Sequence, residues 1–276
     1  TGKLTYALAK NDTGFIALTE HEDPFIQQLA AVRLGTKSTI EESRIERFID
    51  VGSRNRGLLP IPLKYYGAHT GRWAGSDKVN FQNLPSRDKK KKALKQAVVA
   101  PEGYKIINCD SSQIEARVLA WFAGQQDLVD AFARKEDVYR IMASIIYKKT
   151  PQEVLDTDEN PERFVGKTTV LGCGYGMGGE KFHLQLKMQF NKHIPIEETS
   201  RIVDVYRQTY PNIQEIWRSG TKAIEALAKG QTTSWGNGSV VIGKEGILMP
   251  NGLFQRYPNL KKVKDKYGNM QYIYNS

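Results

Sequence analysis

The spacing of apolar residues predicts a chain made mostly of helices. In five segments apolar side chains recur every three or four residues, the period that places them on one face of a helix. These segments are residues 22–50, 128–147, 162–171, 181–189 and 197–228. A further helix is expected directly after Asp110, with an apolar stripe formed by Ile114, Val118, Trp121 and Phe122.

Extended segments are expected in three regions. Residues 58–66 are apolar and interrupted by prolines, which favours an extended chain. Residues 98–99 and 105–109 predict two strands, because Pro101-Glu102-Gly103 supplies a turn between them. The Gly-rich segment 232–249 alternates Val and Ile and predicts a hairpin. Helices and strands together predict an α+β fold.

Composition adds a preference for acidic partners. The chain has 276 residues and a net charge of +10, which suits a polyanion such as nucleic acid. Cys109 and Cys173 lack metal-ligand spacing and indicate a reducing compartment. No apolar run approaches the roughly 18 residues of a membrane span. The chain begins at Thr1 and stops at Ser276 in a strand-like run, so we expect it to be a fragment.

Four residues at a spacing of four are the first candidate for chemistry. Arg163, Lys167, Leu171 and Tyr175 advance about 6 Å per step on a helix and stay on one face. The face therefore presents two cations, an apolar side chain and an aromatic ring in that order. A nucleoside triphosphate has the corresponding order of phosphates, sugar and base, so this face is able to hold one along its length.

Asp110 is the second candidate, because it follows the predicted strand 105–109 and precedes a helix. A carboxylate at a strand end projects beyond the sheet and suits Mg²⁺, which is held by one or two carboxylates plus substrate phosphates. The alternative is an Asp that only caps the next helix. Glu115 has a similar alternative, since Ser112-Gln113-Ile114-Glu115 fits a capping box.

Two glycine patterns near these residues are poor matches to nucleotide motifs. Val165-Gly166-Lys167-Thr168 resembles the end of a P-loop, but Pro161 occupies the position of its first glycine. A G-x-G-x-x-G pattern begins at Gly174, but it follows a helix and a dinucleotide-binding fold needs a preceding strand. Neither pattern therefore predicts a P-loop or a dinucleotide-binding fold.

Taken together, the motifs resemble those of family A DNA polymerases, the DNA polymerase I family. Asp110-Ser-Ser-Gln-Ile-Glu-Ala-Arg is similar to motif A of that family, and Arg163-x₃-Lys167-x₃-Leu171-x₃-Tyr175-Gly is similar to motif B on its fingers helix. Thr70-Gly71-Arg72 and the segment Asn80-Phe-Gln-Asn-Leu-Pro85 look like the upstream element that grips the primer–template minor groove. The three elements occur in the family's order, over nearly the whole chain.

Carried over residue by residue, the resemblance implies a catalytic role for both motifs. Asp110 would bind both catalytic Mg²⁺ ions, and the backbone carbonyl of Ser111 would assist one of them. Arg163 and Lys167 would bind the triphosphate, and Lys167 would protonate the departing pyrophosphate. Phosphoryl transfer depends on such positioning and neutralisation of charge.

The resemblance also assigns contacts to the sugar, the base and the duplex. Tyr175 would stack near the templating position, and Gln113 and Glu115 would flank the nucleotide sugar. Contacts to the primer–template duplex are expected from Arg72, Asn80, Gln82 and Asn83. Minor-groove acceptors are nearly alike on all base pairs, so such contacts check pair shape without reading sequence.

The resemblance implies Mg²⁺ as cofactor, and primer–template DNA and dNTPs as partners, in DNA replication. It implies no membrane partner. The segments LKYYGAHTGRW and LFQRYPNL look most like those of bacteriophage members of the family, so the expected location is the cytoplasm of an infected bacterial host.

The sequence departs from the family pattern at three points. Leu171 stands where Phe or Tyr is more usual, and it covers less sugar surface than a ring. Tyr139 replaces the His often found after Asp137-Val138, keeping a hydroxyl donor for phosphate without the charge. The His-Asp-Glu motif that supplies the second metal carboxylate does not follow Tyr175, so these residues alone are expected to catalyse little.

Two other functions stay open from the residues. A single-subunit RNA polymerase shares the motif A Asp and the Arg, Lys and Tyr spacing, but Glu115 would crowd a ribose hydroxyl. A non-catalytic nucleic-acid-binding module would not need Asp110, Arg163, Lys167 and Tyr175 together.

The resemblance implies an incomplete right-hand polymerase fold with four parts. Residues 1–55 would end a thumb-like helical region, and residues 56–122 would form a palm segment with motif A. Residues 123–245 would form the fingers with motif B, and residues 246–276 would return toward the palm.

Overall fold

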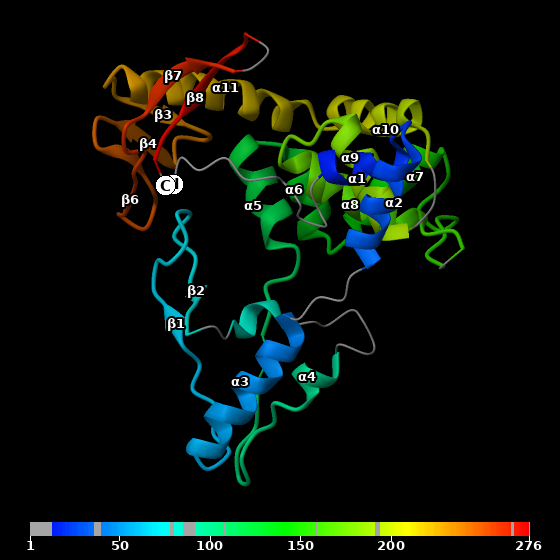
Figure 1. The fold of residues 1–276 in the computed structure, drawn as a ribbon. Helices are drawn as coiled ribbons and strands as arrows, with labels where there is room; N and C mark the ends of the chain where they lie inside the picture. The colour runs from blue at the N-terminus through cyan, green and yellow to red at the C-terminus, as the bar shows by residue number, and fades with distance from the viewer. Residues whose placement is uncertain are drawn as a thin grey trace. The chain divides into compact units, whose positions relative to one another are not determined.

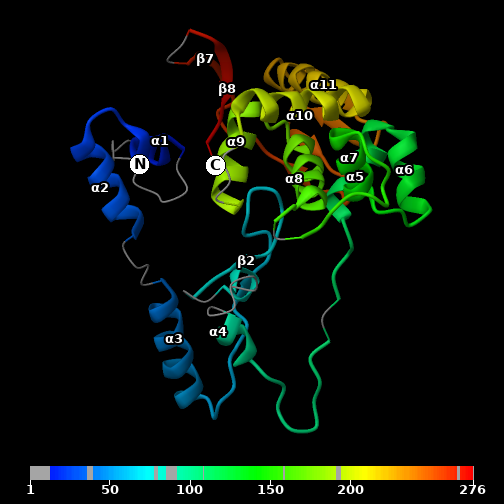
Figure 2. The ribbon, with the colours of Figure 1, turned by 90° about the vertical axis from the view of Figure 1, so that its right-hand side faces the viewer.

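The fold was obtained as a computed structural model, shown in Figures 1 and 2. The structure describes residues 13–35, 40–77, 80–84, 92–107, 109–157, 159–190, 194–265 and 268–275. The chain divides into two compact units, Thr1–Cys109 and Asp110–Ser276, and each is described by itself.

The first unit contains short helices and one small ribbon. The sequence predicted one helical region over residues 22–50, and the structure has two helices there, α2 and α3. Strands β1 and β2 pair antiparallel, with Leu63 opposite Gly75 and Lys64 opposite Ala74. The elements in order are α1 (Thr13–Ala17), η1 (Leu18–Glu20), α2 (Pro24–Gly35), α3 (Ile40–Arg54), β1 (Leu63–Lys64), β2 (Ala74–Gly75), η2 (Phe81–Asn83) and α4 (Lys92–Gln96).

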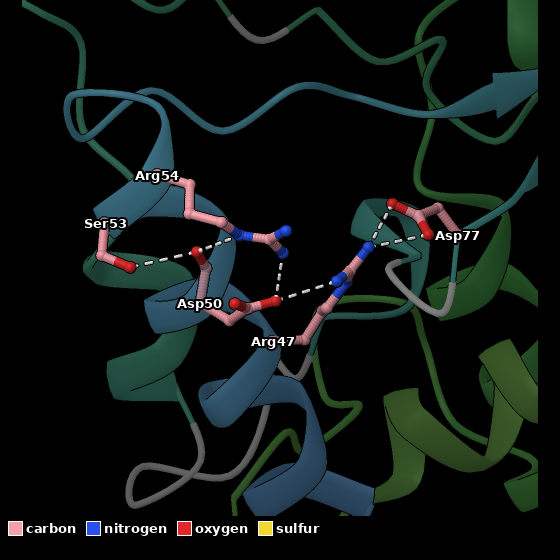
Figure 3. A network of polar contacts seen from close by, with 5 residues as sticks. All are labelled: Arg47, Asp50, Ser53, Arg54 and Asp77. Carbon is pink, nitrogen blue, oxygen red and sulfur yellow. Dashed lines mark hydrogen bonds and ion pairs between the residues drawn. The ribbon is translucent and has the colours of Figure 1, made fainter.

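A polar network centred on Arg47 attaches α3 to the turn after β2 (Figure 3). The Arg47 guanidinium donates to both carboxylate oxygens of Asp77, at 2.8 and 2.7 Å, and to Asp50 at 3.0 Å. Arg54 donates to the same Asp50 carboxylate. Nearby, the rings of Phe48 on α3 and Phe81 on η2 stack with centroids 5.4 Å apart. These contacts fix the position of η2 against α3.

The strands predicted at residues 98–99 and 105–109 are wrong for the residues described there, which carry no strand; residue 108 lies outside the described part. Val99 is 74% exposed, Ile106 62% and Ile107 90%. A strand requires a hydrogen-bonded neighbour, and within the described residues none pairs with this segment. Its apolar pattern is that of a buried strand, but the side chains of Val99, Ile106 and Ile107 are left exposed by the described residues of the first unit.

The second unit is a helical body followed by small sheets. Helix α5 (Ile114–Ala123) follows Asp110, as the sequence predicted. The predicted helix 128–147 is two helices separated near Lys135, which has a left-handed φ of 59°. The predicted helix 197–228 is also two, because Pro211 begins a new helix. The remaining helices are α6 (Gln126–Ala133), α7 (Val138–Tyr147), α8 (Glu162–Gly174), α9 (Gly179–Phe190), α10 (Ile196–Thr209) and α11 (Pro211–Ala228).

The apolar stripe predicted for α5 is not its buried face. Ile114, Val118 and Trp121 are about half exposed, at 48%, 51% and 52%, whereas Ala116 and Ala120 are buried. Small side chains allow close helix contact: a Cβ built on Gly174 of α8 would lie 3.0 Å from Leu119 of α5. Of the predicted stripe, Phe122 alone is partly buried, with its ring against Trp235. The rest of the helix packs mainly through its alanines.

The core of the second unit lies between the helices. Phe182, Met142 and Leu186 are completely buried there. A second cluster joins α11 to a four-stranded meander in the order β3-β4-β5-β6, through Ala223 and Ile242 among others. The sequence predicted only a hairpin here. The strands are β3 (Thr233–Trp235), β4 (Val240–Gly243), β5 (Gly246–Leu248) and β6 (Phe254–Gln255), and β7 (Lys261–Lys264) pairs separately with β8 (Met270–Ile273).

Within the described residues, no helix is both long and apolar enough to cross a membrane.

Candidate nucleotide and nucleic-acid site

Helix α8 carries the four residues that the sequence singled out. Arg163, Lys167 and Leu171 are partly buried on its accessible face, and Tyr175 follows the last helical residue with 64% of its surface exposed. The opposite face is buried in the core of the second unit. The buried residues of α8 are Val165, Gly166, Thr168, Thr169, Val170, Gly172, Cys173 and Gly174. The helix is therefore held from behind, with the predicted face accessible.

Gly166 explains how closely α8 approaches α7. A Cβ built on Gly166 would lie 2.1 Å from the carbonyl oxygen of Tyr139 and 2.9 Å from the backbone nitrogen of Ala143. Only a glycine permits this backbone contact. The glycine that looked like part of a P-loop is thus the packing point that places α8 beside Tyr139.

Arg163 at the start of α8 is oriented by carboxylates. Its Nε donates to Oδ2 of Asp137 at 2.7 Å, and its Nη1 lies 3.6 Å from Asp156. The hydrogen bond to Asp137 raises the pKa of Arg163. Burial opposes ionisation of Asp137, but the bonds from Arg163 and from the backbone amides of α7 outweigh it and lower the pKa of that carboxyl. The guanidinium is therefore charged and fixed in direction.

The same Asp137 also begins α7. Its Oδ1 accepts from the backbone nitrogens of Tyr139, at 3.2 Å, and Arg140, at 3.1 Å, which is an N-cap. One side chain thus caps α7 and aims Arg163 on α8. In the sequence analysis, Asp137 served only to locate Tyr139. An Asp directly before an apolar helical run is, however, a recognisable N-cap signal.

Tyr139 lies beside both cations of α8. The guanidinium carbon of Arg163 is 5.7 Å from the Tyr139 ring centre, and the ammonium nitrogen of Lys167 is 6.0 Å from it. Burial raises the pKa of Tyr139, and the Glu115 carboxylate adds to the increase. The structure therefore brings Glu115, Tyr139, Arg163 and Lys167 into one neighbourhood.

Asp110 and Ser111 lie in an exposed loop ahead of α5. Gln113 begins the helix in a left-handed conformation, with φ of 56° and no side-chain cap, so the capping box that Ser112 and Glu115 suggested is absent. Arg117 donates from Nε to the Ser112 carbonyl oxygen at 2.9 Å and holds the end of the loop. Among the described residues the Asp110 carboxylate makes no hydrogen bond or ion pair, and no cluster of three His, Cys, Asp or Glu side chains suits a metal.

In the first unit, the candidate duplex contacts lie on a turn and on η2. Arg72 is exposed at the end of the β1–β2 ribbon, where Gly71 takes a φ of 80° against the ring of Tyr66. Gln82 and Asn83 are exposed on η2. Asn80 is partly buried, and its side-chain oxygen caps η2 by accepting from the Gln82 backbone nitrogen at 3.0 Å.

Helix α3 supports η2, and the sequence did not predict this support. Arg44 donates from Nη1 to the Asn83 carbonyl oxygen at 3.3 Å, in addition to the Arg47 and Phe48 contacts described above. These partners are 30 or more positions apart in the chain, so no local pattern signals them.

Comparison with known proteins identifies the family. The model of DNA polymerase family A matches residues 6–238. The chain belongs to DNA polymerase family A. The four α8 residues and Asp110 all lie within the matched region.

Individual relatives agree with this assignment. A thermostable DNA polymerase I of Thermus thermophilus is 34% identical over 165 residues, covering 60% of this chain and 18% of the relative. A DNA polymerase of Bacillus phage SP02 is 27% identical and covers 81% of this chain and 38% of its own length. The chain thus spans well under half of these relatives.

A solved structure also matches. It is the POL domain of Pol1 from M. smegmatis, in complex with DNA primer-template and dNTP, with a TM-score of 0.57 and 25% identity. The match covers 84% of this chain and 37% of the other. The mixed helices and antiparallel sheets described above therefore belong to a family A polymerase domain, as the sequence predicted.

Proposed function

We propose that the chain contributes to template-directed DNA polymerisation, the transfer of a nucleotide from a dNTP to a primer 3′-hydroxyl. The observation that carries the proposal is the accessible face of α8, with Arg163 and Lys167 close to Tyr139 at one end and exposed Tyr175 at the other. Family membership supports it, and the matched polymerase domain is in complex with primer-template and dNTP.

In this proposal Arg163 and Lys167 bind the triphosphate. Arg163 uses Nε on Asp137, and a guanidinium has four further N–H donors. Asp137 therefore orients the group and leaves donors for phosphate oxygens. Lys167 carries a mobile ammonium with three donors. It neutralises the departing pyrophosphate and gives it a proton as the P–O bond breaks.

Tyr139 completes the phosphate end of the site. Both cations lie near its ring, at 5.7 and 6.0 Å from the ring centre, and cation–π contacts of that kind help to fix their long side chains. The hydroxyl supplies a neutral donor where a histidine of the family would carry charge. Burial keeps this hydroxyl protonated by raising its pKa.

The other candidate residues, on α8 and near the start of α5, are proposed to contact the sugar and the base. Leu171 packs on the sugar, Gln113 and Glu115 flank it, and Tyr175 stacks near the templating base. Glu115 favours deoxyribose, since a carboxylate near the C2′ position crowds a hydroxyl. This residue and the family assignment both favour a DNA polymerase over a single-subunit RNA polymerase.

Magnesium fits the residues around Asp110. An exposed carboxylate and the adjacent Ser111 carbonyl are the hard oxygen ligands that Mg²⁺ prefers, with substrate phosphates filling other positions. When bound, the metal supplies charge neutralisation on the transferring phosphate. The described residues offer no group of three potential metal ligands, and no His-Asp-Glu motif follows Tyr175 within residues 1–276. We therefore expect residues 1–276 to bind substrates more readily than they extend a primer.

The duplex contacts are assigned to the first unit. Arg72, Gln82 and Asn83 present exposed donors on a turn and on η2, and such side chains contact minor-groove acceptors common to all base pairs. The Asn80 side-chain oxygen is used in capping, so its amide nitrogen is the group proposed to face DNA.

A nucleotide-binding titration tests the proposal. Residues 1–276 are mixed with a primer–template and Mg²⁺, and the affinity for the matched dNTP is measured for wild type, Lys167→Ala and Asp110→Ala. Loss of a charged hydrogen bond predicts roughly 10- to 100-fold weaker dNTP binding for Lys167→Ala. Lys181→Ala, an exposed lysine on α9, is the matched control. Equal affinities for wild type and Lys167→Ala would refute the proposed phosphate site.

Leu171 gives a second test of the orientation of the nucleotide. Leu171→Phe enlarges the surface available to the sugar and is expected to change the ratio of affinities for dideoxy- and deoxynucleotides. The measurement is a competition titration of the two nucleotides against the same primer–template. An unchanged ratio would show that Leu171 does not face the sugar.

A further inference from the structure

A cavity beside the C-terminal end of α8 has no role in the site described above. It lies among α8, α10 and α11 of the second unit, three helices that run close together in Figures 1 and 2, and has a volume of about 400 Å³. That volume falls within the roughly 300–1,000 Å³ of sites for small organic groups. Its lining includes Cys173 of α8 and Gly176, which directly follows Tyr175 beyond the end of that helix.

The floor of the cavity is aromatic. Tyr206 on α10 and Tyr210 directly after this helix are buried, with their rings edge to face and centroids 5.3 Å apart. The Tyr206 hydroxyl is also buried, and among the described residues it has no hydrogen-bond partner. A buried hydroxyl without a partner is costly. The hydroxyl is enclosed by the packing near Gly174 of α8, so the floor offers a ligand an aromatic, apolar surface.

The rim is aromatic and cationic. Gln214, Trp217, Arg218 and Thr221 recur at helical spacing along α11 and face the cavity, and Arg207 faces it from α10. Trp217 is 36% exposed. Arg207 and Arg218 approach carboxylates only at 3.8 and 3.5 Å on the exposed surface, and such pairs are weak. Both guanidiniums therefore stay available to an anion.

We propose that this cavity binds an unpaired nucleotide of a DNA strand, stacking its base on Trp217 and holding its phosphates with Arg207 and Arg218. Aromatic platforms beside cationic side chains are the recurring means of binding single strands. The inference rests on the proposed function for its location: the cavity begins one residue past Tyr175, so the strand that passes the templating position is the strand within reach. The bound nucleotide is then one that awaits copying.

The backbone at Gly176 suits such a strand. Its φ is 76°, and a Cβ built on it would meet nothing within 4 Å. The chain between Tyr175 and the cavity is therefore open, and a nucleotide leaving the Tyr175 side meets no side chain at this position.

Binding of blunt and overhanging duplexes tests the inference. Residues 1–276 are titrated with a fluorescent primer–template that is blunt or carries a 5′ template overhang of one to four nucleotides, and affinity is read by anisotropy. Overhangs beyond the templating nucleotide are expected to tighten binding by roughly tenfold, the usual effect of one stacked base. An abasic residue at the stacked position is expected to abolish this gain.

Substitutions in the cavity test whether the tighter binding of the overhang arises there. Trp217→Ala is expected to lose it, and Trp217→Phe to keep most of it, because a ring still stacks. Tyr206→Phe removes only the enclosed hydroxyl and leaves the ring, so it is expected to keep both the fold and the gain. Arg218→Ala is expected to weaken overhang binding and lower its salt dependence by about one phosphate contact. Trp121→Ala and Lys244→Ala, both exposed and outside the lining, are the matched controls.

The outcomes separate the two proposals. If wild type fails to bind the blunt duplex, the proposed polymerase function fails. If it binds the blunt duplex but the overhang adds nothing, or Trp217→Ala keeps the gain, the cavity proposal alone is overturned. If dAMP at a concentration near the oligonucleotide Kd displaces the overhang, the ligand is a free nucleotide and the strand assignment is overturned.

Discussion

The two units of this chain differ in how they are stabilised. In the second unit the helices α5 to α11 surround a shared core with completely buried side chains such as Phe182, Met142 and Ile202. In the first unit the buried hydrophobic side chains among the described residues are Phe15, Ala30 and Phe48. Its described residues also form exposed polar contacts such as the Arg47 network (Figure 3). One unit is thus stabilised by extensive burial, whereas the described part of the other has little buried apolar surface and only weak, exposed ion pairs in addition.

The difference matters for the proposed function. The proposed nucleotide-binding face belongs to the well-packed unit, where α8 is held from behind by its buried residues. The proposed duplex contacts belong to the sparsely packed unit, whose α2 exposes Phe25, Leu29 and Val32. Apolar surface of that kind is costly in water. The nucleotide face should therefore be preorganised in this chain to a greater degree than the duplex contacts.

The largest expected effect compares two phenylalanines. Phe182→Ala empties a completely buried position and is expected to lower the free energy of unfolding by about 3–5 kcal/mol. Phe25→Ala removes a ring that is 66% exposed and is expected to change it by less than about 0.5 kcal/mol. Urea unfolding followed by circular dichroism measures both. Similar losses for the two variants would show that α2 belongs to a core.

The next comparison uses two glycines in helices. Gly166→Ala places a Cβ 2.1 Å from the Tyr139 carbonyl oxygen and forces α8 away from α7, at a cost of about 2–3 kcal/mol. Gly35→Ala in α2 meets nothing within 4 Å, and the higher helix propensity of alanine should stabilise it by up to about 1 kcal/mol. We expect Gly166→Ala to lower the melting temperature and Gly35→Ala to raise it. A neutral Gly166→Ala would mean that α7 and α8 are not in backbone contact.

The Gly166 variant also links packing to the site. Moving α8 displaces Arg163 and Lys167 from Tyr139, so dNTP affinity is expected to fall together with stability. If stability falls while dNTP affinity stays at the wild-type value, the geometry at Tyr139 is not needed for binding.

The sequence predicted the helices and the α8 face because these depend on local periodicity. Arg163, Lys167 and Tyr175 are related by helical spacing alone, and that spacing is independent of the rest of the fold. The breaks near Lys135 and Pro211 were missed, since apolar periodicity continues across both. Pro211 itself signals the start of a new helix, because proline is favoured at the first helical position.

What the sequence did not predict depends on tertiary contacts. The buried face of α5 follows from the approach of Gly174 to Leu119, and the pairing of Arg163 with Asp137 joins residues 26 positions apart. Residues 105–107 have the pattern of a buried strand, but strand formation depends on a neighbouring strand and not on the pattern. The same limit applies to the support that α3 gives to η2.

The smallest expected effect compares the two arginine-centred networks. Asp137→Asn keeps an N-cap acceptor for α7 but removes the charge that pairs with Arg163. With both side chains about a third exposed, at 30% and 35%, the loss in free energy of unfolding at pH 7 should be about 0.5–1 kcal/mol. Asp77→Asn alters the more exposed Arg47 network, and its effect on stability should be smaller and should disappear in about 0.5 M salt.

The pH dependence sharpens this comparison. The pKa of Asp137 is lowered in the folded chain, so its contribution is present above the unfolded value of about 3.9 and is lost as pH falls through the folded value. The difference between wild type and Asp137→Asn should thus be constant from pH 8 to 5 and shrink in more acid solution. Urea titrations across this range provide the measurement. A difference that persists unchanged into strong acid would show that the charge of Asp137 does not cause it, and that Arg163 is oriented by other groups.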